Sequence, residues 1–342
     1  MFRTPIVASV LLALAVSAGS ALAQQASTSS VTLFGVVDVD ATYGSGSLTK
    51  LRSLGNSGLS GSRLGVRGVE DLGGGLRASF VLEHGFAPDT GQATAVFWNR
   101  QTYVALGSSS LGEVQFGRIY TPTFLVHATY DAFGPQGAAA QQVLLGSVEI
   151  LQPTNIRANN AINYMTPASL GGFVLQAMVA AGEGAATGKY TGVRGAYAGG
   201  PVSVELALAR FYDASIGDLK TITLGGRYKL GDLTLYALHD RANSGRSTDS
   251  TGTQVSMAYV LGATELKASV AQSERKNAAG VNSGTVRRVG VGAVHYLSRR
   301  TALYTSLAKV SNSNGAATAL NGATTAANQG STGIDVGLRH AF

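Results

Sequence analysis

The chain has 342 residues and a formal net charge of +7, with 45 glycines and no cysteine, so a disulfide framework is excluded. Hydrophobic residues make up 45% of it and charged residues only 13%, about half of the usual quarter. No run of about twenty apolar residues follows residue 23, which excludes a transmembrane helix there. The apolar content must therefore be spread through short alternating segments.

Residues 1–23 predict a secretory signal peptide. Arg3 supplies the basic start, an apolar run follows, and Ala21 and Ala23 have the spacing of a cleavage site. The alternative is a membrane-anchoring helix, which the short length and the Ala-x-Ala ending disfavour. We predict cleavage after Ala23 and a single domain over residues 24–342.

The next segments alternate between apolar and polar residues with a period of two, which predicts β-strands. In the first of them Leu33, Val37 and Val39 lie on one face, while Asp38 and Asp40 lie on the other. Residues 286–297 are ambiguous because both faces carry apolar side chains. The clearly alternating segments are residues 31–43, 62–70, 76–84, 201–209, 221–230 and 264–271.

Short turns and long polar loops follow one another in strict alternation, which is typical of a meander of hairpins. About sixteen strands are predicted, and no helical segment with a period of 3.6 residues is found. The short turns are centred on residues 71–73, 110–112, 169–171, 198–200, 230–232, 261–262 and 297–299.

This pattern predicts a transmembrane antiparallel β-barrel, an all-β fold. A flat sheet of this size needs covering layers, and the sequence contains none. Closing the sheet removes both edges, and the charged faces then point inward and the apolar faces outward. An outward apolar face belongs in lipid, where every backbone group must be paired. Short turns at one end, long loops at the other and about sixteen strands predict an outer-membrane barrel with an open lumen.

The segment STGIDVGLRHAF has the same alternation, with Leu338 on its apolar face and Phe342 after it. We predict that this tail closes the barrel against the first strand. Phe342 would then lie in the aromatic girdle at the membrane interface.

Several stretches together resemble the general porins of Gram-negative bacteria, in particular the beta-proteobacterial type. They are SSVTLFGVVDVD, SRLGVRGVEDLGGGLRASFVLEHGF, FWNRQTYVALGSSSLGEVQFGR, YDAFG and VGLRHAF. The resemblance covers essentially the whole mature chain, and its motifs are specific in combination. It implies a homotrimer of sixteen-stranded barrels in the outer membrane, each with its third loop folded into the lumen. It also implies diffusion of small hydrophilic solutes and an assembly signal in the tail.

Residues 121–155 interrupt the alternation. A loop of this length is usually functional or disordered, and its apolar residues allow it to pack. It is also the third long loop, so the resemblance favours a constriction loop on the inner wall. The alternative is an ordinary surface loop with a short helix.

The resemblance also implies a cluster of arginines on the wall of the constriction. Arg63 and Arg118 match that cluster, and Arg67 shares a polar strand face with Arg63. A further arginine near NAINYMTP has no match, because Asn163 and Met165 are not basic. Strict alternation places Arg118 on the lipid side, where a charge costs about 2–4 kcal/mol. We therefore expect a lumenal Arg118.

The constriction loop has few acids to oppose these arginines. Only Asp131 and Glu149 in it are acidic. The sequence therefore predicts a modest preference for anions, opposed by Asp38, Asp40 and Glu83 on neighbouring strands.

Other functions are disfavoured. The chain has no cysteine nucleophile, no Gly-x-Ser-x-Gly elbow and five scattered histidines without metal-ligand spacing, so we expect neither an enzyme nor a metal or cofactor site. The sequence contains no run of basic residues, so nucleic-acid binding is not predicted. A substrate-specific channel would need a file of lumenal aromatics, and a structural or adhesive barrel would need a larger plug.

We expect Trp98, in a polar loop, to contribute to the contact between subunits.

Overall fold

The computed structural model describes residues 29–140, 156–184, 188–212, 218–244 and 248–342. The predicted signal peptide, residues 1–23, and Glu149 lie outside these ranges. Within them, no helix is both long and apolar enough to cross a bilayer.

The described part of the chain forms a succession of strands with one short helix between them. In the first half these are β1 (Ser30–Ser45), β2 (Lys50–Asn56), β3 (Arg63–Gly73), β4 (Leu76–Ala87), β5 (Gln92–Ala93), β6 (Thr102–Ser108), β7 (Gly112–Tyr120), α1 (Pro122–Thr129), β8 (Arg157–Met165) and β9 (Phe173–Ala180). In the second half they are β10 (Lys189–Gly199), β11 (Val202–Tyr212), β12 (Leu219–Leu230), β13 (Leu233–Ser244), β14 (Thr248–Leu261), β15 (Thr264–Asn277), β16 (Asn282–Tyr296), β17 (Thr301–Ser313) and β18 (Ser331–Ala341).

These strands form a single antiparallel barrel with sixteen positions, which confirms the predicted fold. β1 pairs with β2 along one half and with β3 along the other, so β2 and β3 share one position. β4 likewise pairs with both β5 and β6. Each remaining strand pairs with its neighbour in the sequence.

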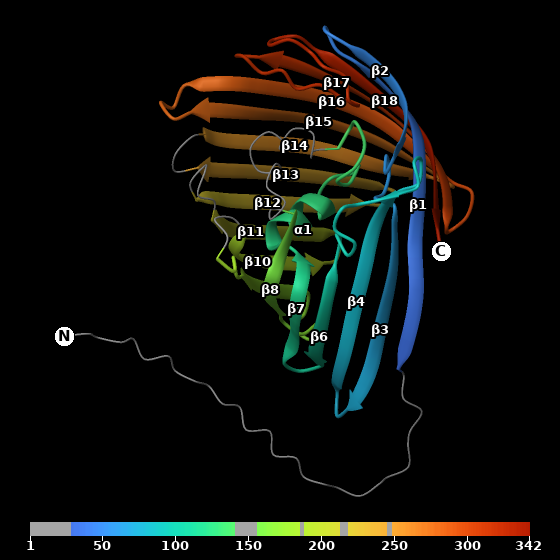
Figure 1. Ribbon diagram of the computed structural model, residues 1–342, viewed down its shortest axis with the longest axis vertical. Coiled ribbons are helices and arrows are strands. Elements are labelled where there is room, and N and C mark those ends of the chain that lie inside the picture. Colours follow the sequence, from blue (N-terminus) through green and yellow to red (C-terminus); the bar gives the residue numbers. More distant parts are fainter. Residues whose placement is uncertain (1–28, 141–155, 185–187, 213–217, 245–247) are drawn as a thin grey trace, which may run out of the picture.

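The barrel closes where β18 pairs with β1, as the alternation of the tail predicts. Leu338 lies opposite Val39 in this register. Gly35 and Phe342 exchange two backbone hydrogen bonds of 3.1 Å beyond the last paired residues. Figure 1 shows the C-terminus beside β1.

The two faces of β11 differ as predicted. On β11 the side chains of Val204 and Leu206 are exposed on the outside, whereas Glu205 and Ala207 are buried on the inside. This inversion of a soluble core is stable only where lipid surrounds the apolar face.

The helix α1 differs from the sequence-based prediction of no helical segment. Thr121 caps it by accepting a hydrogen bond from the backbone N–H of Phe124, and Pro122 begins it. Its eight residues are too few to display a convincing period of 3.6. Val126 and the following Tyr130 pack against the inner face of the barrel.

The described part of the third long loop folds into the lumen, as predicted, and lies against the inner wall. The hydroxyls of Tyr130 and Ser203 on β11 lie 2.6 Å apart, and burial raises the pKa of the Tyr130 phenol. Further along, the backbone N–H of Ala138 donates to the Asp335 carboxylate on β18 over 2.8 Å. Figure 1 shows α1 and the segment after it inside the curve of the strands.

Candidate pore constriction

A buried carboxylate organises the arginines at the loop end of β3 and β4. The Glu83 side chain is only 7% exposed and forms an ion pair with Arg100. The Nε of Arg63 lies 3.8 Å from the other Glu83 oxygen, and its Nη1 donates to the Gly61 carbonyl over 2.8 Å. One carboxylate thus neutralises two guanidinium groups only in part.

Tyr120 joins a third arginine to this group. Its hydroxyl accepts hydrogen bonds from Arg100 over 2.8 Å and from Arg157 over 3.1 Å. The Arg157 guanidinium also lies 4.7 Å from the centroid of the Tyr120 ring, a cation–π contact. We call Arg63, Arg100 and Arg157, with Glu83 and Tyr120, the arginine wall.

Arg118 lies on β7, two residues before Tyr120, and has different hydrogen-bond partners. It donates to the Asn99 carbonyl over 2.8 Å and to the Asn159 side chain. The pairing of β7 with β8 is irregular here, and Gly117 has a φ of +142° that favours glycine. These hydrogen bonds do not involve the arginine wall, but Arg118 lies close enough to Arg157 and Tyr120 to interact with them electrostatically.

Arg67 is not part of the arginine wall either. It is exposed, and its guanidinium lies 5.2 Å from the centroid of the Phe34 ring. Four residues separate it from Arg63 on β3, a distance of about 13 Å along a strand.

Of the acids predicted to oppose the arginines, Glu83 does contact Arg63 and Arg100, whereas Asp38, Asp40 and Asp131 are buried away from them. The Asp38 carboxylate is fully buried and accepts hydrogen bonds from the backbone N–H groups of Leu59 and Ser60, so it fixes the connection between β2 and β3. Asp40 is also buried. In the loop, Asp131 is buried and accepts from the Phe133 N–H over 2.9 Å. Among the described members of the predicted acidic set, only Glu83 therefore forms ion pairs with the arginine wall.

Two arginines of this wall were missed in the sequence. Arg100 stands just before β6 at the end of a polar loop, where no alternation indicates a face. Arg157 begins β8, whereas Asn163, the position considered for a third arginine, is buried and hydrogen-bonded to Gln115 and Gln176. The sequence features that could have indicated them are the position of Arg100 in FWNRQ and the position of Arg157 directly after the long loop.

The opposite side is built mainly from small residues. We call residues 131–140, with the inner faces of β14–β18, the loop wall. Arg288 is 1% exposed there and donates to the Ala140 carbonyl and, over 2.6 Å, to Gln254. A Cβ on Gly290 would lie 2.7 Å from the Ala139 Cβ, so glycine permits the close approach of the loop.

The chemistry of this site is electrostatic. Nowhere in the described ranges do three or more His, Asp or Glu side chains form a group able to hold a metal ion. Partly exposed guanidinium groups can attract passing anions, whereas the buried Arg288 is sequestered from solvent.

Comparisons with known proteins place this geometry in a wider context. The sequence profile described as Gram-negative porin matches residues 8–315. Outer membrane porin protein 32 of Delftia acidovorans is 35% identical, over 97% of this chain and 99% of its own. The solved anion-selective porin from Comamonas acidovorans is 33% identical, covers 92% of this chain and 100% of its own, and has a TM-score of 0.83. The trimer form of OmpT from Vibrio cholerae is 15% identical, covers 92% of this chain and 99% of its own, and with a TM-score of 0.70 supports the fold alone.

Proposed function

Because the chain belongs to the Gram-negative porin family, and is thus an outer-membrane channel rather than an enzyme, we propose that it passes small hydrophilic solutes with a modest preference for anions. The observation that carries this preference is the arginine wall, in which Arg63 and Arg100 share the Glu83 carboxylate and Arg157 donates to the Tyr120 hydroxyl. The solved relative described as anion-selective supports it.

The preference is modest because single charges act weakly in water. Two unit charges about 7 Å apart interact by about 0.6 kcal/mol in bulk water, close to thermal energy. One arginine then enriches anions about two- to threefold, and several must act together in a confined lumen. Salt reduces the effect beyond about 10 Å at 0.1 M ionic strength.

The narrow section of the pore, on this proposal, lies between the arginine wall and the loop of residues 121–155. The contacts of Tyr130 and Ala138 with the inner wall support this role for the described part of the loop. Deleting residues 134–140 should raise the single-channel conductance. A folded deletion variant with the parent conductance would remove the loop from the constriction.

Planar-bilayer recording tests the selectivity. In a tenfold chloride gradient the reversal potential should carry the anion sign. A cation sign in the parent protein would reject the charge assignment while leaving the channel activity intact.

We also propose export through cleavage after Ala23. Sequencing the amino terminus of protein purified from outer membranes should give Gln24 as the first residue. Protein that retains residues 1–23 would contradict the cleavage.

A homotrimer is the assembly that we propose. Val96, Phe97 and Trp98 are exposed apolar residues in the loop before β6. Phe97 stacks on His84 with ring centroids 4.4 Å apart and meets Trp98 edge-on at 4.9 Å. Ordered and exposed aromatic groups of this kind are typical of interfaces.

Light scattering in mild detergent tests the oligomeric state. A monomer would contradict the proposed homotrimer. The variant Trp98→Ala should lower the melting temperature of the trimer. An unchanged melting temperature would leave the trimer standing but remove Trp98 from its interface.

A further inference from the structure

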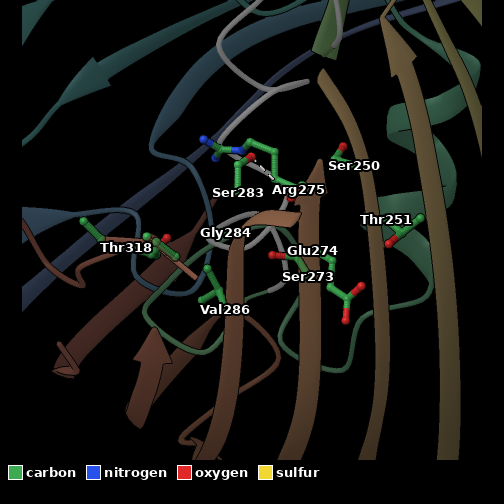
Figure 2. A pocket seen from close by; sticks show the side chains of 12 residues that line it. Ser250, Thr251, Ser273, Glu274, Arg275, Ser283, Gly284, Val286 and Thr318 are labelled. Carbon is green, nitrogen blue, oxygen red and sulfur yellow. Dashed lines mark hydrogen bonds between the residues drawn. The ribbon is translucent and has the colours of Figure 1, made fainter. Parts of the chain in front are cut away.

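A polar cavity of about 340 Å³ lies at the loop end of β14, β15 and β16, away from the arginine wall. Figure 2 shows it from close by. Its volume lies at the lower end of the range for small-molecule sites. Ser250, Arg275, Ser283 and Thr318 contribute to its lining, and we call it the mouth cavity.

The cavity opens on the inner side of the barrel. Ser250, Arg275 and Gly284 lie opposite one another across the three strands and so share a face. Val286 is two residues from Gly284 on that same face and is buried in a cluster with Ala138 of the loop wall. A ligand in the mouth cavity would therefore come from the solution that fills the lumen rather than from the surrounding lipid.

Among the described residues, the Arg275 guanidinium forms no ion pair with a carboxylate. Its Nε is shielded from solvent and has no hydrogen-bond partner within this part of the chain. Glu274 also lines the cavity, but adjacent strand residues point to opposite faces, and its carboxylate accepts from Gln272 over 2.8 Å. Figure 2 shows the Arg275 and Glu274 side chains directed away from each other.

The walls of the mouth cavity are held in place without a ligand. Asn312 donates to the Thr318 carbonyl over 2.8 Å and accepts from its N–H over 3.1 Å. The Gly315 N–H donates to Asn328 over 2.8 Å. A site whose walls are already ordered loses little conformational freedom when it binds.

We propose that the mouth cavity binds a phosphate-type oxyanion, either inorganic phosphate or a phosphate monoester, with Arg275 as the anchor and the Ser250 hydroxyl as a further donor, whereas the Ser283 hydroxyl donates to the Arg275 carbonyl. Guanidinium groups form bidentate, charge-assisted hydrogen bonds with phosphate oxygens. This inference deepens the proposed function, on which it rests for the supply of anions to the lumen.

Equilibrium titration of the detergent-solubilised full-length barrel with inorganic phosphate, followed by ³¹P line broadening, tests this site. Parent protein should bind saturably, and Arg275→Gln should weaken the affinity about tenfold through loss of a charge-assisted contact. Arg287→Gln is the matched control. Arg287 is an exposed arginine of β16 that donates to Gln272 over 2.8 Å, and its loss should leave the affinity within about twofold of the parent value.

The site would be overturned if the parent protein did not bind phosphate saturably. It would also be overturned if Arg275→Gln and Arg287→Gln weakened the phosphate affinity equally. The heat-dependent shift in gel mobility checks that each variant is folded. If Arg275→Gln does not fold, Ser250→Ala replaces it and should weaken binding several-fold, while an unchanged affinity would count against the site. If the reversal potential has the anion sign but phosphate does not bind, this inference fails and the proposed selectivity stands. If phosphate binds but the reversal potential has the cation sign, only the proposed selectivity fails.

Discussion

The arginine wall and the loop wall use the same side chain for opposite purposes. The Arg63 side chain is 25% exposed and shares one carboxylate with Arg100, so part of its charge remains available to solutes. Arg288 is 1% exposed and donates its hydrogen bonds to the loop backbone and to Gln254. Exposure, rather than residue type, therefore separates an arginine that selects ions from one that supports the pore.

Arg288→Ala should have the largest effect, because two buried acceptors lose their donor. We expect a loss in the free energy of unfolding of about 3 kcal/mol or more and a higher single-channel conductance as the loop leaves the wall. Denaturant unfolding and bilayer recording measure the two changes. Arg287→Ala, one residue away, should change neither, and a folded Arg288→Ala channel of parent conductance would end the distinction between the two walls.

Removing the charges of the arginine wall should have the next largest effect. The triple variant Arg63→Gln, Arg100→Gln and Arg157→Gln removes three contributions of about 0.6 kcal/mol each, so the anion-to-cation permeability ratio should fall about tenfold or more. The reversal potential in a chloride gradient measures this ratio. The difference from the parent should shrink near 1 M salt, where charges are screened beyond about 3 Å. An unchanged ratio at low salt would mean that these charges do not face the ion path.

Glu83→Gln should move the ratio in the opposite direction by a smaller amount. It removes the buried carboxylate between Arg63 and Arg100. One unit charge at this range corresponds to about a two- to threefold increase in anion preference. A lower anion-to-cation permeability ratio in folded Glu83→Gln channels would show that Glu83 acts mainly by orienting the two arginines.

Arg67→Gln should have the smallest effect, under about twofold in the permeability ratio, because Arg67 lies about 13 Å along β3 from Arg63, a distance over which salt screens its charge. The same reversal-potential measurement tests it. A shift as large as that of the triple variant would extend the selective region along β3 and weaken the comparison.

The strands could be predicted because the period of two records which side faces lipid. The ambiguous segment 286–297 shows where this signal weakens. Its outer face carries Val289 and Val291, as expected, but its inner face carries Val286, which is buried in the same cluster as the loop residues. The loop wall makes part of the inner face apolar, and the alternation disappears.

The arginine wall was less predictable because its members lie at strand ends. Arg100 precedes β6, Arg157 begins β8 and Tyr120 ends β7. Their proximity depends on how the loop ends meet in space. Likewise, the alternation of the sequence does not reveal the irregular pairing between Gly117 and Ile119, where Arg118 lies.

The seam between β1 and β18 has a consequence for how a cell makes this pore safely. The two strands are about 300 residues apart in the sequence, so the joint can form only when nearly all of the intervening chain has been delivered. A partly delivered chain has two unpaired edges and no joint, and so it is not a closed conduit through the bilayer. Late closure thus limits the time during which an incomplete product could leak.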